Sequence, residues 1–276
     1  MSLSLNKLLK KNQPIVMGIL NTTPDSFSDG GKFNSSETAI NHALEMLRDG
    51  ADIIDVGGES TRPGADAVSA EEEMRRVVPI IKALRLQSNV CISIDTSKPD
   101  VMRAAVQAGA NLVNDVNALR EPGALAVCAE LGVPVCVMHM QGEPRTMQET
   151  PRYDDVVEDI KLFLLQRVNE CVAAGIKREN IIIDPGFGFG KNLQHNLQLL
   201  QRLHEFESLG VPVLVGLSRK SMLGLILGSP VEQRLYASVA AAVLAWTKGA
   251  KIFRVHDVKP TVDALKVCVA VQTSSG

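Results

Sequence analysis

Residues that could do chemistry recur in this sequence at the ends of short apolar runs. Asp95 follows the run Val90–Ile94, and Asp184 closes the run Ile181–Asp184. Carboxylates and amides at such positions can read the donor and acceptor edge of a flat heterocycle. Arginine, histidine and lysine at neighbouring run ends suit an anion. The full set of these polar residues also includes Asn21, Asp55, Glu59, Thr61, Arg62, Asn114, His139, Ser218, Arg219, Lys220, Arg254, His256 and Asp257.

Asp95 has the clearest functional reading of this set. An acidic residue shortly before Pro99 could cap a helix that begins there. Thr96 or Ser97 is better placed for that capping, because each lies closer to the first helical residue. This leaves Asp95 without a local structural role, and we therefore predict that it acts in a site.

Three other positions carry a structural interpretation beside the functional one. The sequence Asp184-Pro-Gly is by itself a common turn. His139 lies between two methionines, which is more typical of a packed histidine than of a catalyst. Lys220 could be a Schiff-base nucleophile, a charge clamp or a solvated group. With Ser218 and free helix N–H groups beside it, the Lys220 turn also suits a carboxylate or phosphate.

The elements that position these residues alternate along the whole chain. The apolar runs are mostly continuous, as expected for parallel strands covered on both faces. Helical patterns over Ser36–Arg48, Pro99–Ala108 and Asp154–Ala174 separate some of them, each followed by a glycine at or near its end. Eight such units predict a (β/α)₈ barrel as a single domain over residues 1–276, with its chemistry at the carboxyl ends of the strands. The predicted strands are Ile15–Leu20, Asp52–Val56, Val90–Ile94, Leu112–Val116, Val133–Met138, Ile181–Asp184, Val211–Leu217 and Lys251–Val255.

Two connections of the predicted barrel are unusually long. They cover about Asn21–Ser35 and Gly57–Ala70, after the first and second strands. Long connections in compact domains are usually functional or disordered. We therefore predict two mobile loops over the mouth of the barrel. Arg62, between Gly57 and Gly64, could bring a guanidinium over a phosphate-bearing substrate.

Composition excludes several other classes of protein. The 276 residues include 29 basic and 31 acidic residues, a formal charge of −2, and only 4% aromatic residues. This argues against a binder of nucleic acid or membrane surfaces. The five cysteines are scattered without metal-ligand spacing, which fits a reducing compartment. We expect a cytoplasmic protein with no membrane span.

Eight blocks of this sequence, taken together, resemble dihydropteroate synthase of the bacterial folate pathway. They follow the family's order and fall at all eight predicted strand ends, which is far more specific than any block alone. The blocks are Asn21–Gly31, Asp55–Gly64, Ile94–Thr96, Asn114–Asp115, Met138–Gly142, Asp184–Lys191, Ser218–Ser221 and Arg254–Asp257.

The resemblance implies a homodimeric barrel that joins 6-hydroxymethyl-7,8-dihydropterin diphosphate to p-aminobenzoate, with sulfonamides as competitors. It implies Mg²⁺ between the diphosphate and Asn21, and catalytic roles for Asp95, Lys220 and Arg254. By motif, the pterin would be bound by Asp95, Asn114, Met138, Asp184 and Lys220. The diphosphate would be bound by Asn21, Arg62, Arg254 and His256. The p-aminobenzoate would be bordered by Phe27, Thr61, Arg62, Pro63, Ser218 and Lys220.

Three other functions stay open on the residues alone. They are a pterin-dependent methyltransferase barrel acting on a corrinoid, a Schiff-base aldolase that uses Lys220, and a non-catalytic pterin-binding barrel. The methyltransferase would have little use for Arg62, Arg254 and His256 around a diphosphate. Ligand binding alone would not need both complete loop motifs. Candidate dimer faces, on apolar content, are Val258–Val271 and Leu235–Trp246.

Overall fold

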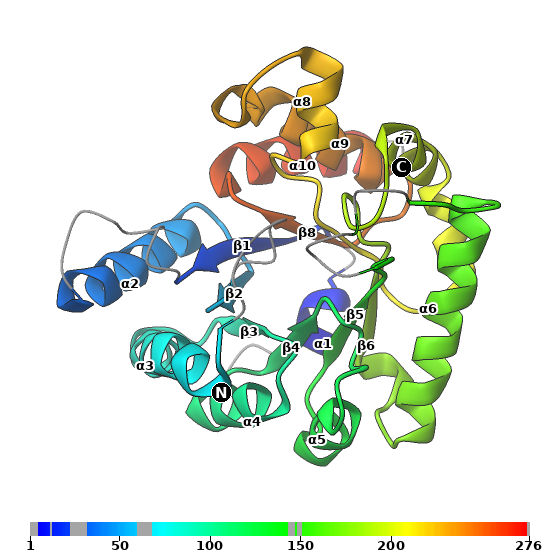
Figure 1. Cartoon of the computed structure of the whole chain (residues 1–276). Helices are drawn as coiled ribbons and strands as arrows, with labels where there is room; N and C mark the ends of the chain where they lie inside the picture. The colour runs from blue at the N-terminus through cyan, green and yellow to red at the C-terminus, as the bar shows by residue number, and fades with distance from the viewer. Residues whose placement is uncertain are drawn as a thin grey trace.

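The eight strands in the described part of the chain form one parallel sheet that curves into a barrel (Figure 1). The computed structural model describes residues 5–11, 13–22, 32–59, 68–142, 147 and 151–274, with the backbone alone at 32–35. The sheet order is β6-β5-β4-β3-β2-β1-β8-β7, and a parallel bridge between Ile183 and Val213 joins its two ends. The predicted (β/α)₈ barrel is therefore confirmed. The predicted mobile loops fall mainly on 23–31 and 60–67, outside the described residues.

The observed strands lie where the apolar runs predict them. They are β1 Ile15–Asn21, β2 Ile53–Gly57, β3 Cys91–Asp95, β4 Leu112–Asp115, β5 Val135–Met138, β6 Ile181–Asp184, β7 Leu214–Val215 and β8 Ile252–Val255. Only β7 is much shorter than predicted. Pro212 has no N–H to donate to a neighbouring strand, although its carbonyl accepts from the Ile183 N–H.

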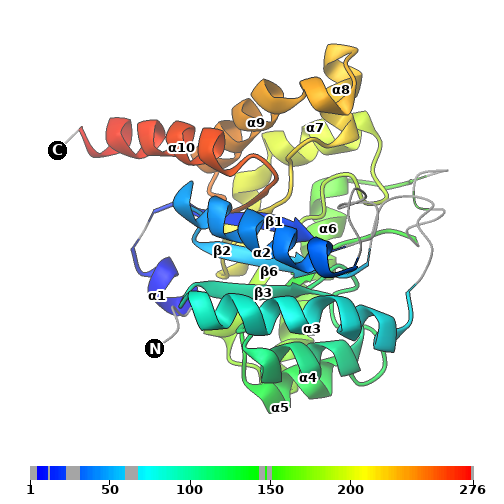
Figure 2. The ribbon, with the colours of Figure 1, turned by 90° about the vertical axis from the view of Figure 1, so that its left-hand side faces the viewer.

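Helices surround the barrel, and the three predicted helices are all present (Figure 1). The side view shows α1 near the amino-terminal ends of the strands, apart from the outer helices (Figure 2). The helices are α1 Leu5–Leu9, α2 Lys32–Arg48, α3 Ala70–Gln87, α4 Pro99–Ala108, α5 Ala124–Leu131, α6 Val156–Ala173, α7 Leu193–Gln201, α8 Ser221–Leu227, α9 Leu235–Thr247 and α10 Val258–Thr273. Three 3₁₀ turns are η2 Arg178–Asn180, η3 Leu203–Leu209 and η4 Val231–Gln233.

The inside of the barrel is apolar at the end where the strands begin. Every strand contributes at least one buried side chain to a single cluster there. Leu5 and Leu8 of α1 pack against this cluster and close the barrel at the end where the strands begin. The cluster residues on the strands are Ile15, Met17, Ile53, Cys91, Leu112, Cys136, Ile182, Leu214 and Ile252.

One layer further along the barrel axis, the interior becomes polar. Side chains two positions apart on a strand point to the same face. The residue two positions after an apolar cluster member is therefore also directed inward, and on five strands it is polar. These inward polar residues are Asp55, Ser93, Asn114, Asp184 and Arg254. The strand register thus gathers them above the apolar layer.

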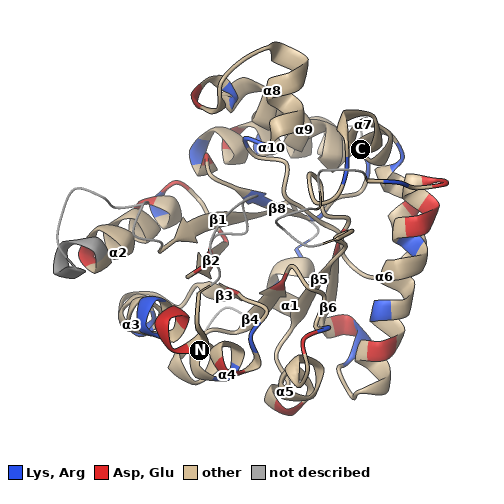
Figure 3. Ribbon diagram, in the orientation of Figure 1, with Lys and Arg blue, Asp and Glu red and all other residues tan. Residues whose placement is uncertain are grey.

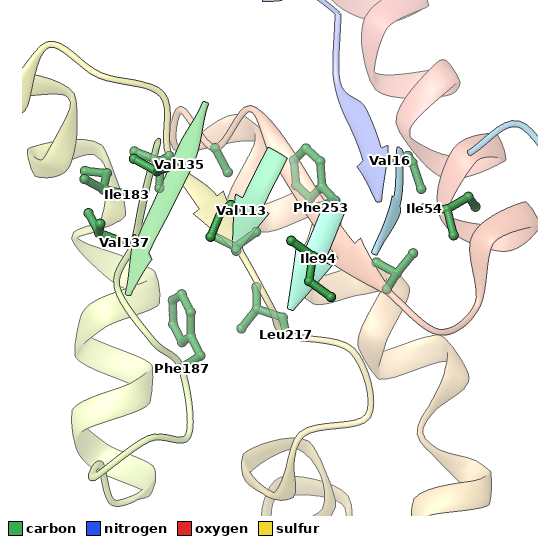
Figure 4. Packing of buried hydrophobic residues seen from close by; sticks show 14 of the residues in the cluster. Val16, Ile54, Ile94, Val113, Val135, Val137, Ile183, Phe187, Leu217 and Phe253 are labelled. Atoms are coloured by element: carbon green, nitrogen blue, oxygen red, sulfur yellow. The ribbon is translucent and has the colours of Figure 1, made fainter. Parts of the chain in front are cut away.

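The outward faces of the strands pack against the helices and form the larger core. Figure 4 shows Ile54, Val113, Val135 and Phe253 within this cluster. Burial of a side chain of this size contributes about 1.5–3 kcal/mol to folding. Because both faces of each strand are buried, the strand sequences carry no polar alternation except at the inward polar layer.

Charged side chains lie mostly on the outer helices. Figure 3 shows basic and acidic residues interspersed along α6. Ion pairs such as Lys161–Glu158 and Arg202–Asp155 occur on this surface. Among the described residues, no helix combines the length and the apolar character needed to cross a membrane.

Candidate active site

Arg254 links two carboxylates at the carboxyl ends of the strands. Its Nε donates to Asp55 Oδ2 and its Nη2 donates to Asp95 Oδ2, each over 2.6 Å. Asn114 Nδ2 donates to the same Asp55 oxygen over 3.3 Å. Strands β2, β3, β4 and β8 therefore each contribute one group to a connected polar network.

Burial governs the ionisation of this network. Asp55 is 0% exposed and Asp95 is 9% exposed. Burial raises the pKa of Asp95 to about 7, and Asp55 adds to the rise, whereas Arg254 acts in the opposite direction. Burial also works against the charge on Arg254, but Asp55 and Asp95 outweigh it and raise the pKa of the guanidinium. The cation is thus firmly held, and Asp95 is a carboxylate that titrates near neutrality.

Asn21 and Asp95 lie on either side of Gly57, which has no side chain to keep them apart. A Cβ added at Gly57 would lie 3.5 Å from Asp95 Cβ and 3.7 Å from Asn21 Oδ1. The register pairs Gly57 with both residues on the neighbouring strands. The sheet therefore brings an amide oxygen and a carboxylate to the same part of the barrel mouth.

The connection after β6 turns back tightly onto β5. The Gly186 N–H donates to Asp184 Oδ1 over 2.7 Å. Gly186 has φ +72°, and a Cβ there would lie 1.9 Å from the His139 carbonyl oxygen. Only glycine can satisfy both conditions. Burial raises the pKa of Asp184, and the hydrogen bond from Gly186 opposes that rise.

Gly186→Ala is expected to be much more destabilising than Gly132→Ala. Both glycines have left-handed backbone, but at Gly132, with φ +63°, an added Cβ meets nothing within 4 Å. Gly132→Ala should cost about 1 kcal/mol of unfolding free energy from backbone strain alone. At Gly186 the clash with backbone should add a further loss on the order of 1–3 kcal/mol. Urea unfolding of both variants measures the difference, and equal losses would show that the β6 connection yields freely.

Lys220 faces Asp184 from the next loop. Its Nζ lies 4.1 Å from the centroid of the Phe189 ring, and Gly188 leaves room for its methylene chain. Burial lowers the pKa of Lys220 to about 8; Asp184 opposes this shift and Arg254 adds to it. Lys220 is therefore a cation that can lose its charge at mildly alkaline pH.

The last two strands bring together Ser218 and His256. The Ser218 Oγ lies 3.1 Å from His256 Nδ1 and accepts the backbone N–H of His256 over 3.1 Å. Arg219, with φ +57°, pairs with Asp257. The site is thus edged by a histidine and a serine on the β7–β8 side.

The expected capping of α4 by Thr96 or Ser97 is wrong. The N-cap residue is Lys98, which makes no side-chain capping bond. Ser97 Oγ instead donates to Asp115, whose carboxylate also accepts the backbone N–H groups after β4. The Ser97 hydroxyl is therefore directed at a buried carboxylate and not at the first N–H groups of α4. The conclusion that Asp95 has no capping role still holds.

Comparison with known proteins identifies the family. A model of pterin-binding enzymes matches residues 17–256. The dihydropteroate synthase of Haemophilus influenzae is 57% identical over 262 residues, which cover 95% of each chain. The chain belongs to the dihydropteroate synthase family.

Two solved structures of the family have the same fold. One is a Yersinia pestis dihydropteroate synthase with a sulfonamide drug complex, at 53% identity, a TM-score of 0.91 and 95% coverage of both chains. The other is a Xanthomonas albilineans enzyme in complex with 7,8-dihydropteroate, at 51% identity and a TM-score of 0.87, covering 95% of this chain and 94% of that one. These relatives support the synthase over the corrinoid methyltransferase, the aldolase and the non-catalytic barrel.

The structure gathers most of the residues that the family motifs nominate. Asp95, Asp184, Lys220 and Arg254 are linked by hydrogen bonds or electrostatic interactions, and Asn114 joins them through Asp55. Met138 is 4% exposed and packs with Met140 and Met147 near the Gly186 turn. Asn21, Ser218 and His256 lie at neighbouring strand ends. Four nominated residues lie outside the described residues, namely Phe27, Thr61, Arg62 and Pro63.

Sequence reasoning missed two members of the site. Asp55 was among the polar strand ends but received no role, although it is the deepest partner of Arg254. Its position two residues after the inward Ile53 was the available signal. Phe189 lies under Lys220, and its place between two glycines gave no indication of that contact. His139, by contrast, is packed against Phe163 as predicted.

Proposed function

We propose that this chain condenses 6-hydroxymethyl-7,8-dihydropterin diphosphate with p-aminobenzoate, giving 7,8-dihydropteroate and diphosphate. The observation that carries the proposal is the buried network of Asp55, Asp95, Asn114 and Arg254 at the barrel mouth, next to Asp184 and Lys220. The relative in complex with 7,8-dihydropteroate, the product of this reaction, supports the same assignment.

The pterin would lie across the mouth, within the polar layer. A pterin ring presents N–H donors on one edge, which carboxylates such as Asp184 can accept, and acceptors that Asn114 and Lys220 can meet. Met138 supplies an apolar, polarizable surface for the ring face. Because these groups are buried, an unmatched heterocycle would leave a polar group unpaired, which supplies specificity.

The diphosphate would lie toward Asn21, Arg254 and His256. Two of the five Arg254 N–H groups are used by Asp55 and Asp95, and the others can donate to phosphate oxygens. We infer that Arg62 joins them from the loop after β2.

A divalent cation fits this part of the mouth as a partner of the substrate. Asn21 Oδ1 is an oxygen of the kind that Mg²⁺ prefers, and it lies near Asp95. The described residues contain no cluster of three or more histidine, cysteine or acidic side chains that could hold a metal. Mg²⁺ bound mainly through substrate oxygens, with Asn21 beside it, would neutralise charge on the diphosphate.

The reaction breaks the bond between the pterin methylene carbon and the diphosphate oxygen, and the electron pair leaves with diphosphate. Arg254 donates toward the oxygens on which negative charge grows. The methylene carbon left behind is electron-poor, and the ionised Asp95 carboxylate stabilises it electrostatically. The neutral aniline nitrogen of p-aminobenzoate then forms the new C–N bond and releases a proton, so no strong general base is needed.

The p-aminobenzoate pocket would be built partly from Ser218 and Lys220. We infer that Phe27, Thr61, Arg62 and Pro63 complete it from the two long loops. The ammonium of Lys220, above the Phe189 ring, is the described group best placed to attract the carboxylate or carbonyl of a ligand here. Sulfonamides, which resemble p-aminobenzoate, would compete at this pocket.

Diphosphate release from purified protein tests the proposal. The protein is supplied with the pterin diphosphate and Mg²⁺, with and without p-aminobenzoate, and a parallel sample receives EDTA. We expect release coupled to dihydropteroate formation, and its loss on chelation. Pterin binding without any release would instead support a non-catalytic barrel, and release that is unaffected by EDTA would contradict the Mg²⁺ assignment.

The pH profile of kcat/KM is expected to be bell-shaped. Asp95, with a pKa of about 7, must be ionised, so activity should fall as the pH drops below about 7. Lys220, with a pKa of about 8, must be charged, so activity should fall as the pH rises above about 8. In Lys220→Arg, whose side chain stays protonated, residual activity should lose the alkaline limb. An unchanged alkaline limb in this variant would assign it to another buried cation, such as Lys191, whose pKa burial lowers to about 7.

We also propose a homodimer formed through α8, α9 and α10. These helices expose large apolar side chains, including Leu225, Tyr236, Leu244 and Val267, at 67%, 85%, 51% and 64%. Exposed apolar patches of this kind mark interaction sites. Sedimentation of the chain and of a Leu244→Glu variant tests the interface, since a charge there should favour the monomer.

A cytoplasmic location and a single domain over residues 1–276 complete the proposal. All five cysteines are free, which suits a reducing compartment. All described strands belong to one sheet, which supports a single domain.

A further inference from the structure

Lys191 is a buried cation that the proposed reaction does not use. It ends the glycine-rich connection after β6 and is 3% exposed. Its Nζ lies 2.8 Å from the Gly186 carbonyl oxygen, 2.9 Å from the Phe189 carbonyl oxygen and 3.0 Å from His139 Nδ1. An ammonium group has three N–H donors, so these three acceptors satisfy it completely.

The ionisation of His139 matches this arrangement. Burial lowers the pKa of His139 to about 2, and Lys191 contributes to that shift, so the imidazole is neutral. A neutral imidazole can present Nδ1 as an acceptor. Burial likewise lowers the pKa of Lys191 to about 7, while Asp184 opposes the shift. The charged form of Lys191 is therefore maintained by Asp184 and by the acceptors around Nζ.

Both carbonyls held by Lys191 belong to residues that contact the side chains proposed to bind the pterin, namely Asp184 and Lys220. The Gly186 N–H donates to Asp184 Oδ1, while the Gly186 carbonyl accepts from Lys191. The Phe189 ring lies under the Lys220 ammonium, while the Phe189 carbonyl accepts from Lys191. One buried ammonium thus fixes the two residues against which Asp184 and Lys220 rest.

We propose that Lys191 is a positioning residue of the pterin site, which holds the β6 connection so that Asp184 and Lys220 keep their binding geometry. This inference rests on the proposed function. Without the ammonium, the Gly186 and Phe189 carbonyls and His139 Nδ1 lose a buried donor, which is costly. The connection would then rotate to find water. That rotation removes the Gly186 N–H from Asp184 and the Phe189 ring from Lys220.

Binding of two separate ligands to Lys191→Met tests the proposal. Calorimetry measures the Kd of 6-hydroxymethylpterin, and separately the Kd of inorganic diphosphate with Mg²⁺. We expect the pterin Kd to rise by about tenfold or more, which corresponds to one lost charged hydrogen bond. Diphosphate binding should change little, because Arg254 lies in β8 and His256 directly follows it, whereas Lys191 holds the connection after β6. Unchanged pterin binding in a folded variant, or equal losses for both ligands, would overturn the proposal.

A matched control separates positioning from general loosening of this connection. Tyr153 Oη donates over 2.8 Å to the Gly190 carbonyl, which lies on the same connection but is not one of the two carbonyls that Lys191 holds. Tyr153→Phe removes that bond and should leave pterin affinity unchanged. If Tyr153→Phe weakens the pterin as much as Lys191→Met, Lys191 has no specific positioning role.

A second pair of variants decides the matter if Lys191→Met does not fold. Asn and Leu have nearly the same shape, so His139→Asn and His139→Leu lose the same ring contacts. Asn keeps an oxygen near the Nδ1 position that can accept from Lys191, whereas Leu does not. We expect His139→Leu to bind pterin several-fold more weakly than His139→Asn. Equal affinities would overturn the proposal, whereas a wild-type chain that binds no pterin would instead contradict the proposed function.

Discussion

Replacing Arg254 with methionine is expected to cost both stability and activity. Arg254 lies between Asp55 and Asp95, and its removal leaves two buried carboxylates facing each other. Breaking a buried ion pair in this way costs about 3–5 kcal/mol of unfolding free energy. Loss of the cation from the departing diphosphate should also lower kcat by roughly 100- to 1,000-fold. Urea unfolding and steady-state kinetics measure the two effects.

A double variant separates these two effects of Arg254. Asp55→Asn combined with Arg254→Met removes one of the uncompensated charges, so part of the stability should return while kcat stays low. Arg103→Met serves as the control, because Arg103 makes a similar two-bond pair with Glu130 but on the surface. It should leave turnover unchanged. If Arg254→Met were as stable as Arg103→Met, the buried carboxylates of Asp55 and Asp95 would not depend on Arg254 for compensation of their charge.

Asp95→Asn should depress turnover far more than it weakens pterin binding. Asparagine keeps the shape and an acceptor oxygen but removes the negative charge that stabilises the electron-poor pterin methylene. We expect kcat to fall by about 100- to 1,000-fold, as for loss of other transition-state electrostatic groups. The pterin Kd should rise by less than tenfold, roughly one hydrogen bond to a charged group. Calorimetry and single-turnover kinetics give the two numbers.

The acid limb of the pH profile provides a second test of Asp95. If Asp95 is the group that titrates at about 7, the residual activity of Asp95→Asn should not fall as the pH drops from about 7 toward 6. Asp52→Asn is a suitable control. Asp52 accepts the Val16 N–H at the opposite end of the barrel, and its loss should leave both turnover and the acid limb unchanged. Equal losses of turnover and affinity in Asp95→Asn would argue against its role as a cation stabiliser.

The contacts of Lys191 and His139 illustrate a general property of this barrel. The polar groups at its mouth are supported by other buried polar groups. Asp115 organises the turn after β4 in the same way, by accepting from Ser97 and from the Asn117 and Leu119 N–H groups. Such support is expected where a site must hold charged groups out of water.

Local features of the amino-acid sequence were enough to predict the barrel. Continuous apolar runs separated by helical patterns are local features, and they predicted eight strands in nearly the observed places. The same local rule located Asp95, Asn114 and Asp184, because parallel strands of a barrel deliver their last residues to one end. A family resemblance spread over eight strand ends then gave the reaction.

Which groups pair and which are charged depends instead on contacts between distant parts of the chain. Arg254 meets Asp55 and Asp95 across 199 and 159 residues of chain. Lys191 follows a glycine-rich run and has the sequence context of a surface lysine, yet it is buried against His139. Burial and pKa depend on every atom that surrounds a group, and most of those atoms come from distant strands. A local pattern of residues does not contain the combined effect of these distant atoms. The pairing and the charge states therefore became visible only in the closed barrel.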